Sequence, residues 1–360
     1  MKFIQILHIE NAWGNVSIKT LSPSTFSWVS HGCAYQVLLQ NALKTFNNSS
    51  FYLPSSQNAI LGTVIHKIYE LTLKGELRNL TDLKYKWEEL IAIEKNKLTT
   101  NYPTLRNAIL NDYDKRNRTI RYAMSMMKGC NYASNDGSVK KVYSEKWLDC
   151  EDLGLKGIAD KLIIEDGYVD VVDFKSGYVK DDNGDIRAEY VMQLHLYAAM
   201  CQFLSFGTPR SLNLIDIDGQ SYEIPYNSDY SKQLLTEVKR ALQVLNDAVA
   251  SRNFSSYAKP ELGMCPFCSC RHICNYRIIP DDSYYKTITG KVAEIPSTNM
   301  YVLSNGEDMI YISGINVYNV DDPNYYLGKN LTFVNIARAS QTADVYTYKI
   351  TENTLVYEQL

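Results

Sequence analysis

The 360-residue sequence has no apolar run of the length that a membrane span needs. Its opening residues, MKFIQILHIENAW, also lack the long apolar region of a secretory signal, because Gln5, His8 and Glu10 interrupt them. We therefore expect an intracellular, cytoplasmic protein without membrane contact. Clustered cysteines in a reducing cytosol bind metal more often than they form disulfides, so metal binding is the favoured role for such a cluster.

The sequence also has little net charge and no phosphate-binding P-loop. A formal charge of −3 gives no overall attraction to nucleic acid, so any contact with phosphate has to come from a local patch or a metal ion. The pattern G-x-x-x-x-G-K-[ST] does not occur, and the chain contains no internal repeat. The sequence thus predicts no ATP-driven motor, and any unwinding of a duplex would need a separate helicase.

Helical and strand-like patterns alternate along the first 280 residues. Ser22 begins a helical pattern as a hydroxyl N-cap, and the first third of the chain is mainly helical. Strand-like alternation follows at 142–148 and 155–175. Helical periodicity returns over 187–206 and 230–252. This order predicts an α/β domain with helical additions.

The last eighty residues have a different pattern, made of short runs rich in Tyr, Val and Ile. About five strands at this spacing indicate a small barrel or sandwich, with an OB-fold barrel as the candidate. We expect one domain over residues 1–279, a linker at 280–282 and a small all-β domain over 283–360. That second domain would either guide a nucleic-acid strand by tyrosine stacking or dock a partner.

Residues 157–175 contain a predicted β-hairpin with charged residues at one end. A two-residue turn at Asp166-Gly167 would place Asp160 directly opposite Asp173, with Lys175 on the same face. Like charges in that position are destabilising unless a cation lies between them, and a divalent metal ion meets this need. The alternative is a salt-bridge ladder on a solvated sheet, which the apolar character of the rest of this face disfavours.

Four motifs in this order resemble the PD-(D/E)xK nuclease superfamily, a restriction-endonuclease-like fold. They are Gly62 to His66, Gly157 to Asp160, Asp173-Phe174-Lys175, and Gln193 to Tyr197. With the cysteines, they are most similar to the RecB-type nucleases, especially the AddB branch and the CRISPR adaptation exonucleases that carry an iron–sulfur cluster. The resemblance covers residues 22–276. Ala159 stands where the superfamily's name has proline, a variation that the RecB-like branch tolerates.

The resemblance implies a catalytic role for each motif residue. Asp160 and Asp173 would hold Mg²⁺ or Mn²⁺, with the Phe174 carbonyl and His66 as further ligands. Lys175 would position or activate the attacking water. Hard oxygen ligands suit these metals, which generate hydroxide and neutralise charge on the phosphate.

Several residues near these motifs have two possible roles. By resemblance, Gln193 and Tyr197 would contact nucleic acid or steady the lysine, whereas a plain amphipathic helix would also show this spacing. His66 outside its motif would be read as a structural histidine. Glu70 could orient His66 or pair with a neighbour on its own helix. Glu145 matches an acidic position of RecB-like enzymes, with no role assigned.

The segment CPFCSCRHIC, residues 265–274, is a candidate metal site. Three soft ligands follow a C-x₂-C-x₅-C spacing: Cys265, Cys268 and Cys274. A tetrahedral metal or a cubane cluster needs four. Cys270 or His272 would complete a compact zinc knuckle, and Cys33 is the distant alternative.

The resemblance favours Cys33 and a [4Fe–4S] cluster over Zn²⁺. In those nucleases one cysteine precedes the nuclease core and three follow it at this spacing. A link from Cys33 to Cys265 closes a loop of more than two hundred residues, and such a cross-link is worth about 5 kcal/mol in lost chain entropy. The scattered Cys130, Cys150 and Cys201 are predicted to be packing residues.

These features together predict a metal-dependent DNA nuclease, by resemblance an exonuclease, that hydrolyses phosphodiester bonds. It would act in DNA repair, recombination, phage replication or defence, on DNA that is single-stranded or has free ends. A separate helicase or a recombination or adaptation protein would be its partner. The alternative is a non-catalytic nucleic-acid-binding or scaffold protein with a zinc knuckle.

Overall fold

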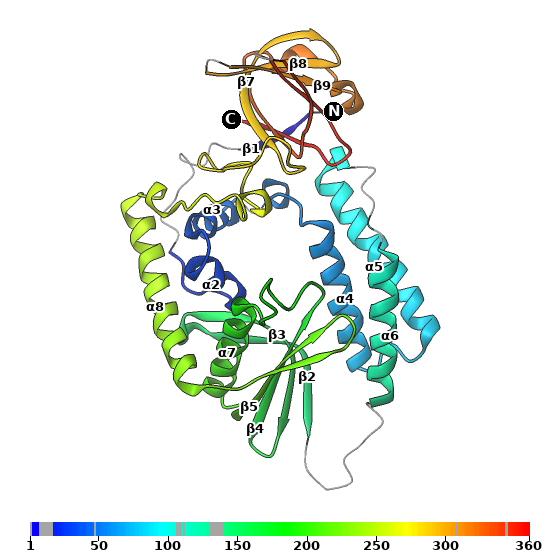
Figure 1. Cartoon of the computed structure of the whole chain (residues 1–360), viewed down its shortest axis with the longest axis vertical. Coiled ribbons are helices and arrows are strands. Elements are labelled where there is room, and N and C mark those ends of the chain that lie inside the picture. The colour runs from blue at the N-terminus through cyan, green and yellow to red at the C-terminus, as the bar shows by residue number, and fades with distance from the viewer. Residues whose placement is uncertain are drawn as a thin grey trace.

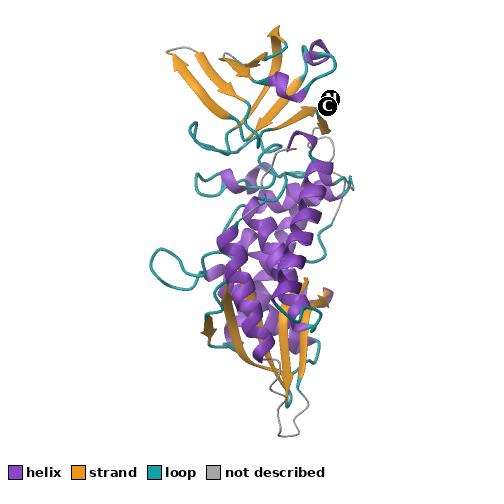
Figure 2. Cartoon of the chain, turned by 90° about the vertical axis from the view of Figure 1, so that its right-hand side faces the viewer, coloured by secondary structure: helices purple, strands orange, loops and turns teal. Residues whose placement is uncertain are grey.

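A computed structural model of the chain shows a mixed α/β protein with two β-sheets (Figure 1). It describes residues 2–6, 17–46, 48–105, 110, 112–129, 140–306, 308–342 and 345–360. Figure 2 shows the helices in the middle of the molecule, with one sheet at the lower end and the C-terminal strands at the upper end. Within the described residues, no helix combines the length and the apolar character that crossing a membrane would require.

The nuclease-like part combines a five-stranded sheet with seven α-helices among the described residues. The strands are β2 (Lys141–Cys150), β3 (Leu155–Glu165), β4 (Tyr168–Lys175), β5 (Thr208–Asp216) and β6 (Ser221–Ile224), in that spatial order. The helices are α2 (Pro23–Ser30), α3 (Ala34–Lys44), α4 (Gln57–Leu73), α5 (Leu80–Asn101), α6 (Tyr113–Gly129), α7 (Ala188–Phe203) and α8 (Ser228–Ser251).

The expected helix starts are mostly found. Ser22 caps α2, its hydroxyl accepting a hydrogen bond from the Thr25 N–H at 3.0 Å. The mainly helical first third is interrupted by a short 3₁₀ turn that ends at Leu105, and α6 begins at Tyr113. Cys33 lies at the N-cap of α3.

Strand β4 is buried on both faces and therefore forms the centre of the nuclease-like part. Val169 and Val171 face the core formed with α2, α3, α7 and α8, whereas Val172 and Phe174 face the core formed with α4, α5 and α6. Figure 1 shows these two groups of helices on opposite sides of the sheet. The strand carrying Asp173 and Lys175 is thus held by packing from both sides.

The predicted hairpin between β3 and β4 is confirmed. Asp166 and Gly167 both have positive φ, 50° and 79°, as a two-residue type I′ turn requires. Lys161 pairs with Val172 in the antiparallel ladder. β4 continues into a parallel pairing with β5, and the other neighbours in this sheet are antiparallel.

The C-terminal strands form a curled sheet consistent with a half-barrel. It contains β7 (Thr287–Ser297), β8 (Met300–Asn305), β9 (Asp308–Ser313), β10 (Asn330–Val334), β11 (Ala337–Thr342), β12 (Val345–Lys349) and β13 (Leu355–Gln359). Among the described residues these are seven strands instead of the five or so expected, because β8, β11 and β13 also pair in this sheet. The OB-fold assignment stays a prediction.

The N-terminal strand β1 (Ile4–Ile6) belongs to this second sheet, where it runs parallel to β13. Phe3 packs in the same core, and its N–H donates to the Tyr326 hydroxyl at 2.8 Å. This differs from the expected placement of residues 1–279 in a single unit. A three-residue apolar strand carries no signal for which sheet it joins; the division into two domains stays a prediction.

Gly167, in the turn between β3 and β4, and Gly207, just before β5, allow a direct test of how closely these two segments pack. Gly207 has a φ of 141°, and a Cβ there would lie 2.6 Å from the Gly167 carbonyl oxygen, whereas a Cβ at Gly167 would meet nothing within 4 Å. We expect Gly167→Ala to lower the free energy of unfolding by about 1 kcal/mol, for its left-handed backbone alone. Gly207→Ala should cost at least about 2 kcal/mol. Equal losses in urea unfolding would contradict this packing.

Candidate active site

Three carboxylates lie in one row across neighbouring strands. Glu145 and Asp160 fall between the β2–β3 pairs Ser144–Lys161 and Lys146–Ala159. Asp160 and Asp173 lie one step beyond the last β3–β4 pair, Lys161–Val172. Glu145 has a left-handed backbone with φ of 50°, which costs a non-glycine residue about 1–2 kcal/mol. Strain of this kind is concentrated at functional sites. The row therefore marks a candidate active site.

His66 reaches this row from helix α4. Its Nδ1 atom is 3.3 Å from Asp160 Oδ1 and 3.8 Å from Glu145 Oε1. The potential ligand atoms of these three residues all lie within 4.8 Å of one another. The other oxygen of Asp160 accepts a hydrogen bond from the Phe174 N–H at 2.7 Å, which fixes the carboxylate and leaves Oδ1 facing His66. One imidazole with hard oxygen donors suits a divalent metal ion.

Asp173, Lys175 and Gln193 form a closed group beside the row. The Lys175 ammonium is 2.7 Å from Asp173 Oδ2 and donates to Gln193 Oε1 at 3.0 Å. The Gln193 amide donates to Asp173 Oδ1 at 3.1 Å. Lys175 also lies 4.6 Å from the centre of the Tyr190 ring. Asp173 is buried, and apart from the Lys175 ammonium its Oδ2 atom has no partner among the described residues.

The electrostatics of the site favour an added cation. Burial raises the pKa of Asp173 to about 6, opposed by Lys175 and assisted by Asp160. Burial lowers the pKa of His66, but the carboxylates of Asp160 and Glu145 outweigh it and raise that pKa to about 10. His66 is thus an imidazolium that partly neutralises the acids. A metal ion would replace its proton.

Gly62 and Gly157, the glycines of the first two motifs, each lie where a side chain would be crowded by a neighbour. A Cβ at Gly157 would lie 3.1 Å from the Tyr197 hydroxyl, and one at Gly62 would lie 3.1 Å from Ser176 Oγ. Gly157 therefore allows the motif residue Tyr197 to approach closely, and Gly62 does the same for Ser176, which follows Lys175. Tyr197 itself is buried, and burial followed by the charges of Asp173 and Asp160 raises the pKa of its hydroxyl.

The structure favours one of the two roles of Glu70 and brings Glu145 close to His66. Glu70 accepts from Lys67 at 2.6 Å and from Lys74 at 2.5 Å on its own helix, so of its two readings the structure favours the helix partner. Glu145 was not among the expected metal ligands. The signal that could have found it is an acidic residue on the strand before Asp160. The register was hidden because a 3₁₀ turn, Glu151–Leu153, connects these strands.

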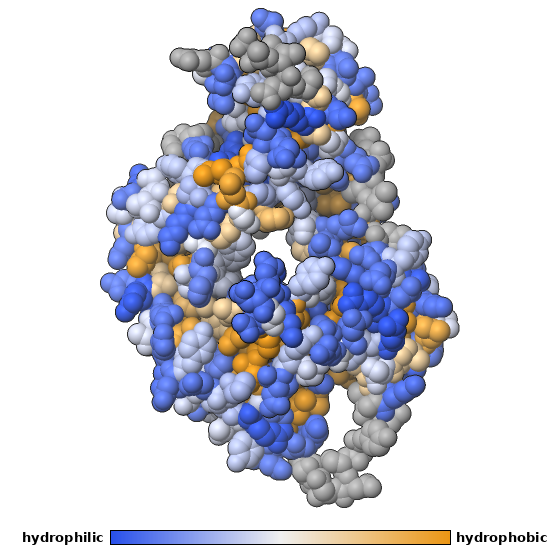
Figure 3. Space-filling model, in the orientation of Figure 1, coloured by the Kyte–Doolittle hydropathy of each residue, from blue (hydrophilic) through white to orange (hydrophobic). Residues whose placement is uncertain are grey.

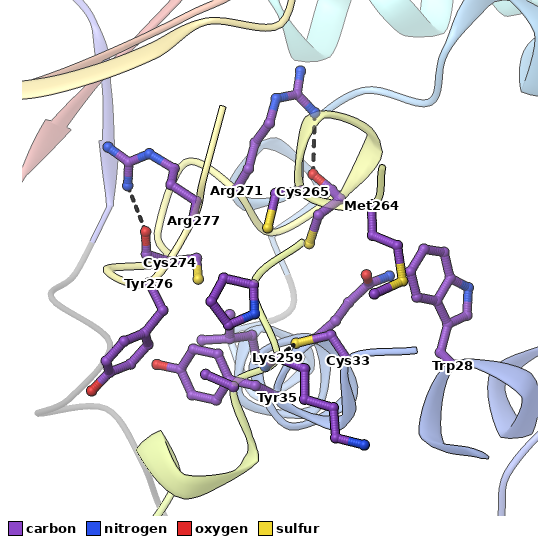
Figure 4. Close-up of a pocket in the computed structure, with 15 residues that line it drawn as sticks. Trp28, Cys33, Tyr35, Lys259, Met264, Cys265, Arg271, Cys274, Tyr276 and Arg277 are labelled. Atoms are coloured by element: carbon purple, nitrogen blue, oxygen red, sulfur yellow. Dashed lines mark hydrogen bonds between the residues drawn. The ribbon is translucent and has the colours of Figure 1, made fainter. Parts of the chain in front are cut away.

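A second candidate centre lies at the cysteines (Figure 4). Cys33, from the start of α3, lines the same pocket as three cysteines of the 265–274 segment, namely Cys265, Cys268 and Cys274. Cys270 is fully buried outside this lining, with its thiol directed at the Gln36 carbonyl. His272 bonds the Phe51 carbonyl oxygen through Nε2 at 2.8 Å and packs on Tyr357. Neither local alternative contributes to the pocket.

The thiols are spaced more widely than a single tetrahedral ion requires. Zn–S bonds of about 2.3 Å hold four sulfurs about 3.8 Å apart. Among the described cysteines, no three sulfurs lie mutually within 4.8 Å. Backbone N–H groups of Lys259 and Cys270 donate to the sulfurs of Cys33 and Cys268 at 3.4 Å each. The four thiols that line this pocket could hold a metal centre.

The other cysteines behave as expected where they are described. Cys150 and Cys201 are buried in the main core, and burial raises the pKa of each thiol. Cys130 lies outside the described residues.

Metal binding at the carboxylate row should strengthen with pH. The metal must displace a proton from His66 and needs an ionised Asp173, so the Kd for Mn²⁺ should fall as the pH rises from about 6 to about 10. Titration calorimetry measures this. Glu145→Gln should weaken binding at least about tenfold, since even residues that only orient ligands are worth that much. The exposed Glu76→Gln is the matched control. A pH-independent Kd, or equal Kd values in both variants, would contradict the assignment.

Comparison with known proteins places the chain in a family. Two solved structures are similar: a protein from Eubacterium rectale described as a candidate exonuclease (13% identity, TM-score 0.39, 74% of this chain and 92% of that chain) and SSO0001 (16% identity, TM-score 0.25, 59% and 96%). A search of curated proteins found no match. The family model of the PD-(D/E)XK nuclease superfamily matches residues 20–275. Because this match covers most of the chain, the protein belongs to the PD-(D/E)XK nuclease superfamily.

Proposed function

We propose that the protein is a Mg²⁺- or Mn²⁺-dependent deoxyribonuclease of the RecB/AddB-like branch, acting as an exonuclease. The observation that carries this proposal is the row of Glu145, Asp160 and Asp173 with His66 on one side and Lys175 on the other. A scaffold protein would gain nothing from three opposed carboxylates, which only a cation can stabilise. The row therefore argues against the non-catalytic alternative.

The site residues divide the work of phosphodiester hydrolysis. His66, Asp160 and Asp173 would hold the metal, assisted by Glu145 and the Phe174 carbonyl. When bound, such a metal lowers the pKa of a water molecule and neutralises charge on the phosphate.

Lys175 would act as a cation beside that metal. Burial lowers the pKa of its ammonium, but Asp173 more than offsets this, so the pKa is raised and the group is charged at neutral pH. Lys175 would therefore hold the attacking water or a phosphate oxygen by donating hydrogen bonds. Gln193 and Tyr190 keep it in place.

The shape of the molecule supports a substrate with a free end. Figure 3 shows an opening through the middle of the molecule, with hydrophilic residues along its lower rim. In Figure 1 this region lies between α2 and α3 on one side and α4, which carries His66, on the other. An opening of this kind would admit a single strand end-first. DNA that is single-stranded or has free ends is accordingly the proposed substrate, supplied by a separate helicase or recombination protein.

We also propose that Cys33, Cys265, Cys268 and Cys274 bind a [4Fe–4S] cluster. All four line one pocket, and their spacing is too wide for preformed zinc coordination. The cluster would tie the first helices to the segment after α8. Its role would be structural, with hydrolysis at the carboxylate row.

The nuclease proposal predicts a specific loss in one carboxylate variant. With Mn²⁺, the protein should degrade DNA, and Asp173→Asn should slow this by at least about 100-fold, because it removes charge stabilisation at the reacting phosphate. End-labelled single-stranded and circular substrates separate exonuclease from endonuclease action. The control is Asp166→Asn, the same chemical change at the exposed turn of the same hairpin, where Asn is favoured. Equal activity in both variants would refute the assignment.

The cluster proposal predicts colour and iron content. Protein purified without oxygen should be brown, with iron near four per chain if one [4Fe–4S] cluster is bound. Cys33→Ala should lose the iron, whereas Cys270→Ala should keep it because that thiol lies outside the pocket lining. Stoichiometric zinc without visible absorption would contradict the cluster.

A further inference from the structure

We propose that Arg271 and Arg277 are anion-binding residues of the cysteine pocket, which balance the negative charge of a metal–sulfur centre and link that centre to the C-terminal sheet. Both residues line the pocket together with the four cysteines. The inference rests on the proposed cluster but is independent of nuclease activity.

Both arginines are cations without an acidic partner among the described residues. Arg271 is 93% buried, and Arg277 is partly buried. Neither guanidinium has a carboxylate within 4.0 Å among the described residues, whereas the exposed Arg210 has two, Asp170 and Glu165. A buried charge without a counter-charge is strongly destabilising. Something negative in the pocket would remove this cost.

The two arginines make parallel sets of contacts with neutral groups. Arg271 donates to the Cys268 carbonyl at 3.1 Å and to Asn335 Oδ1 at 2.7 Å. Arg277 donates to the Cys274 carbonyl at 2.6 Å and to Thr289 Oγ1 at 2.8 Å. Figure 4 shows the bond from Arg277 to the Cys274 carbonyl as a dashed line.

These contacts join the cysteine segment to the second sheet. Asn335 directly follows β10, and Thr289 lies in β7. The Arg271 guanidinium also lies 5.4 Å from the Tyr285 ring, which contacts Phe267 of the cysteine segment. The Arg271 Nε atom has no hydrogen-bond partner among the described residues. Each arginine thus spans from the backbone of one proposed ligand to the C-terminal sheet.

The charge of a thiolate-bound cluster matches this pair. Four thiolates around an oxidised [4Fe–4S] core give a net charge of about −2, equal and opposite to two guanidinium groups. Reduction adds one more negative charge, which nearby cations stabilise. Loss of the centre would leave two uncompensated cations at the contacts that hold β7 and β10. Loss of the centre would therefore weaken the contacts that hold β7 and β10 of the C-terminal sheet.

The reduction potential of the centre tests the charge role. In an anaerobic redox titration followed by absorbance and electron paramagnetic resonance, Arg271→Gln and Arg277→Gln should each lower the midpoint potential, and the double variant should lower it further. Arg271→Lys and Arg277→Lys, which keep the charge, should stay near the wild-type value. Arg240→Gln, on an exposed face of α8, is the matched control. Unchanged potentials in both Gln variants would overturn the inference.

Hydrogen–deuterium exchange tests the link without any substitution. Removal of iron from the wild-type protein by a chelator should speed exchange at the amides of β7 and β10 and leave β3 and β4 unchanged. Unchanged exchange in β7 and β10 would overturn the link. A wild-type protein without iron would overturn the inference together with the proposed cluster. If the protein is an active nuclease that contains iron, and the midpoint potential of the iron centre is the same in wild type and in both Gln variants, the inference alone would be overturned.

Discussion

The repulsion among three carboxylates in adjacent strands is the constraint around which the nuclease core is arranged. Strand pairing aligns Glu145, Asp160 and Asp173, and packing on both faces of β4 prevents the last of them from moving away. His66 and Lys175 offset part of the repulsion from two sides. Burial, with a smaller contribution from the charge of Asp160, still raises the pKa of Asp173 despite the opposing charge of Lys175. A divalent cation would offset the remaining negative charge, and under the proposed function the same cation would serve phosphodiester hydrolysis.

The cysteine pocket has the opposite imbalance. There a buried and a partly buried arginine line the pocket with four thiols, and no carboxylate of the described residues lines it. An anionic centre would compensate them, just as a cation would compensate the carboxylate row. The two centres also differ in position: one lies on the central sheet, and the other lies where α3, the segment after α8 and the C-terminal sheet meet (Figure 1). This separation is consistent with the two proposed roles: hydrolysis at the carboxylate row and a purely structural role for the cysteine centre.

Local sequence signals predicted the parts of the site that depend on local geometry. The Asp166-Gly167 turn predicts the hairpin register because both residues accept positive φ, and the structure has that register. Glu145 could not be placed in the same way, since the turn before β3 does not determine a register. The pairing of β1 with β13 depends on residues more than three hundred positions apart. Arg271 and Arg277 carry no sequence signal, because their distinguishing property is burial without an acidic partner.

The central claim is that the carboxylate row binds the catalytic metal, and anomalous diffraction from a crystal soaked in Mn²⁺ tests it most directly. The account predicts one strong anomalous peak in direct contact with Asp160 and Asp173, with His66 within ligand distance, and loss of this peak in Asp173→Asn crystals. A manganese ion bound elsewhere, or a row that stays empty at saturating Mn²⁺ and alkaline pH, would contradict it.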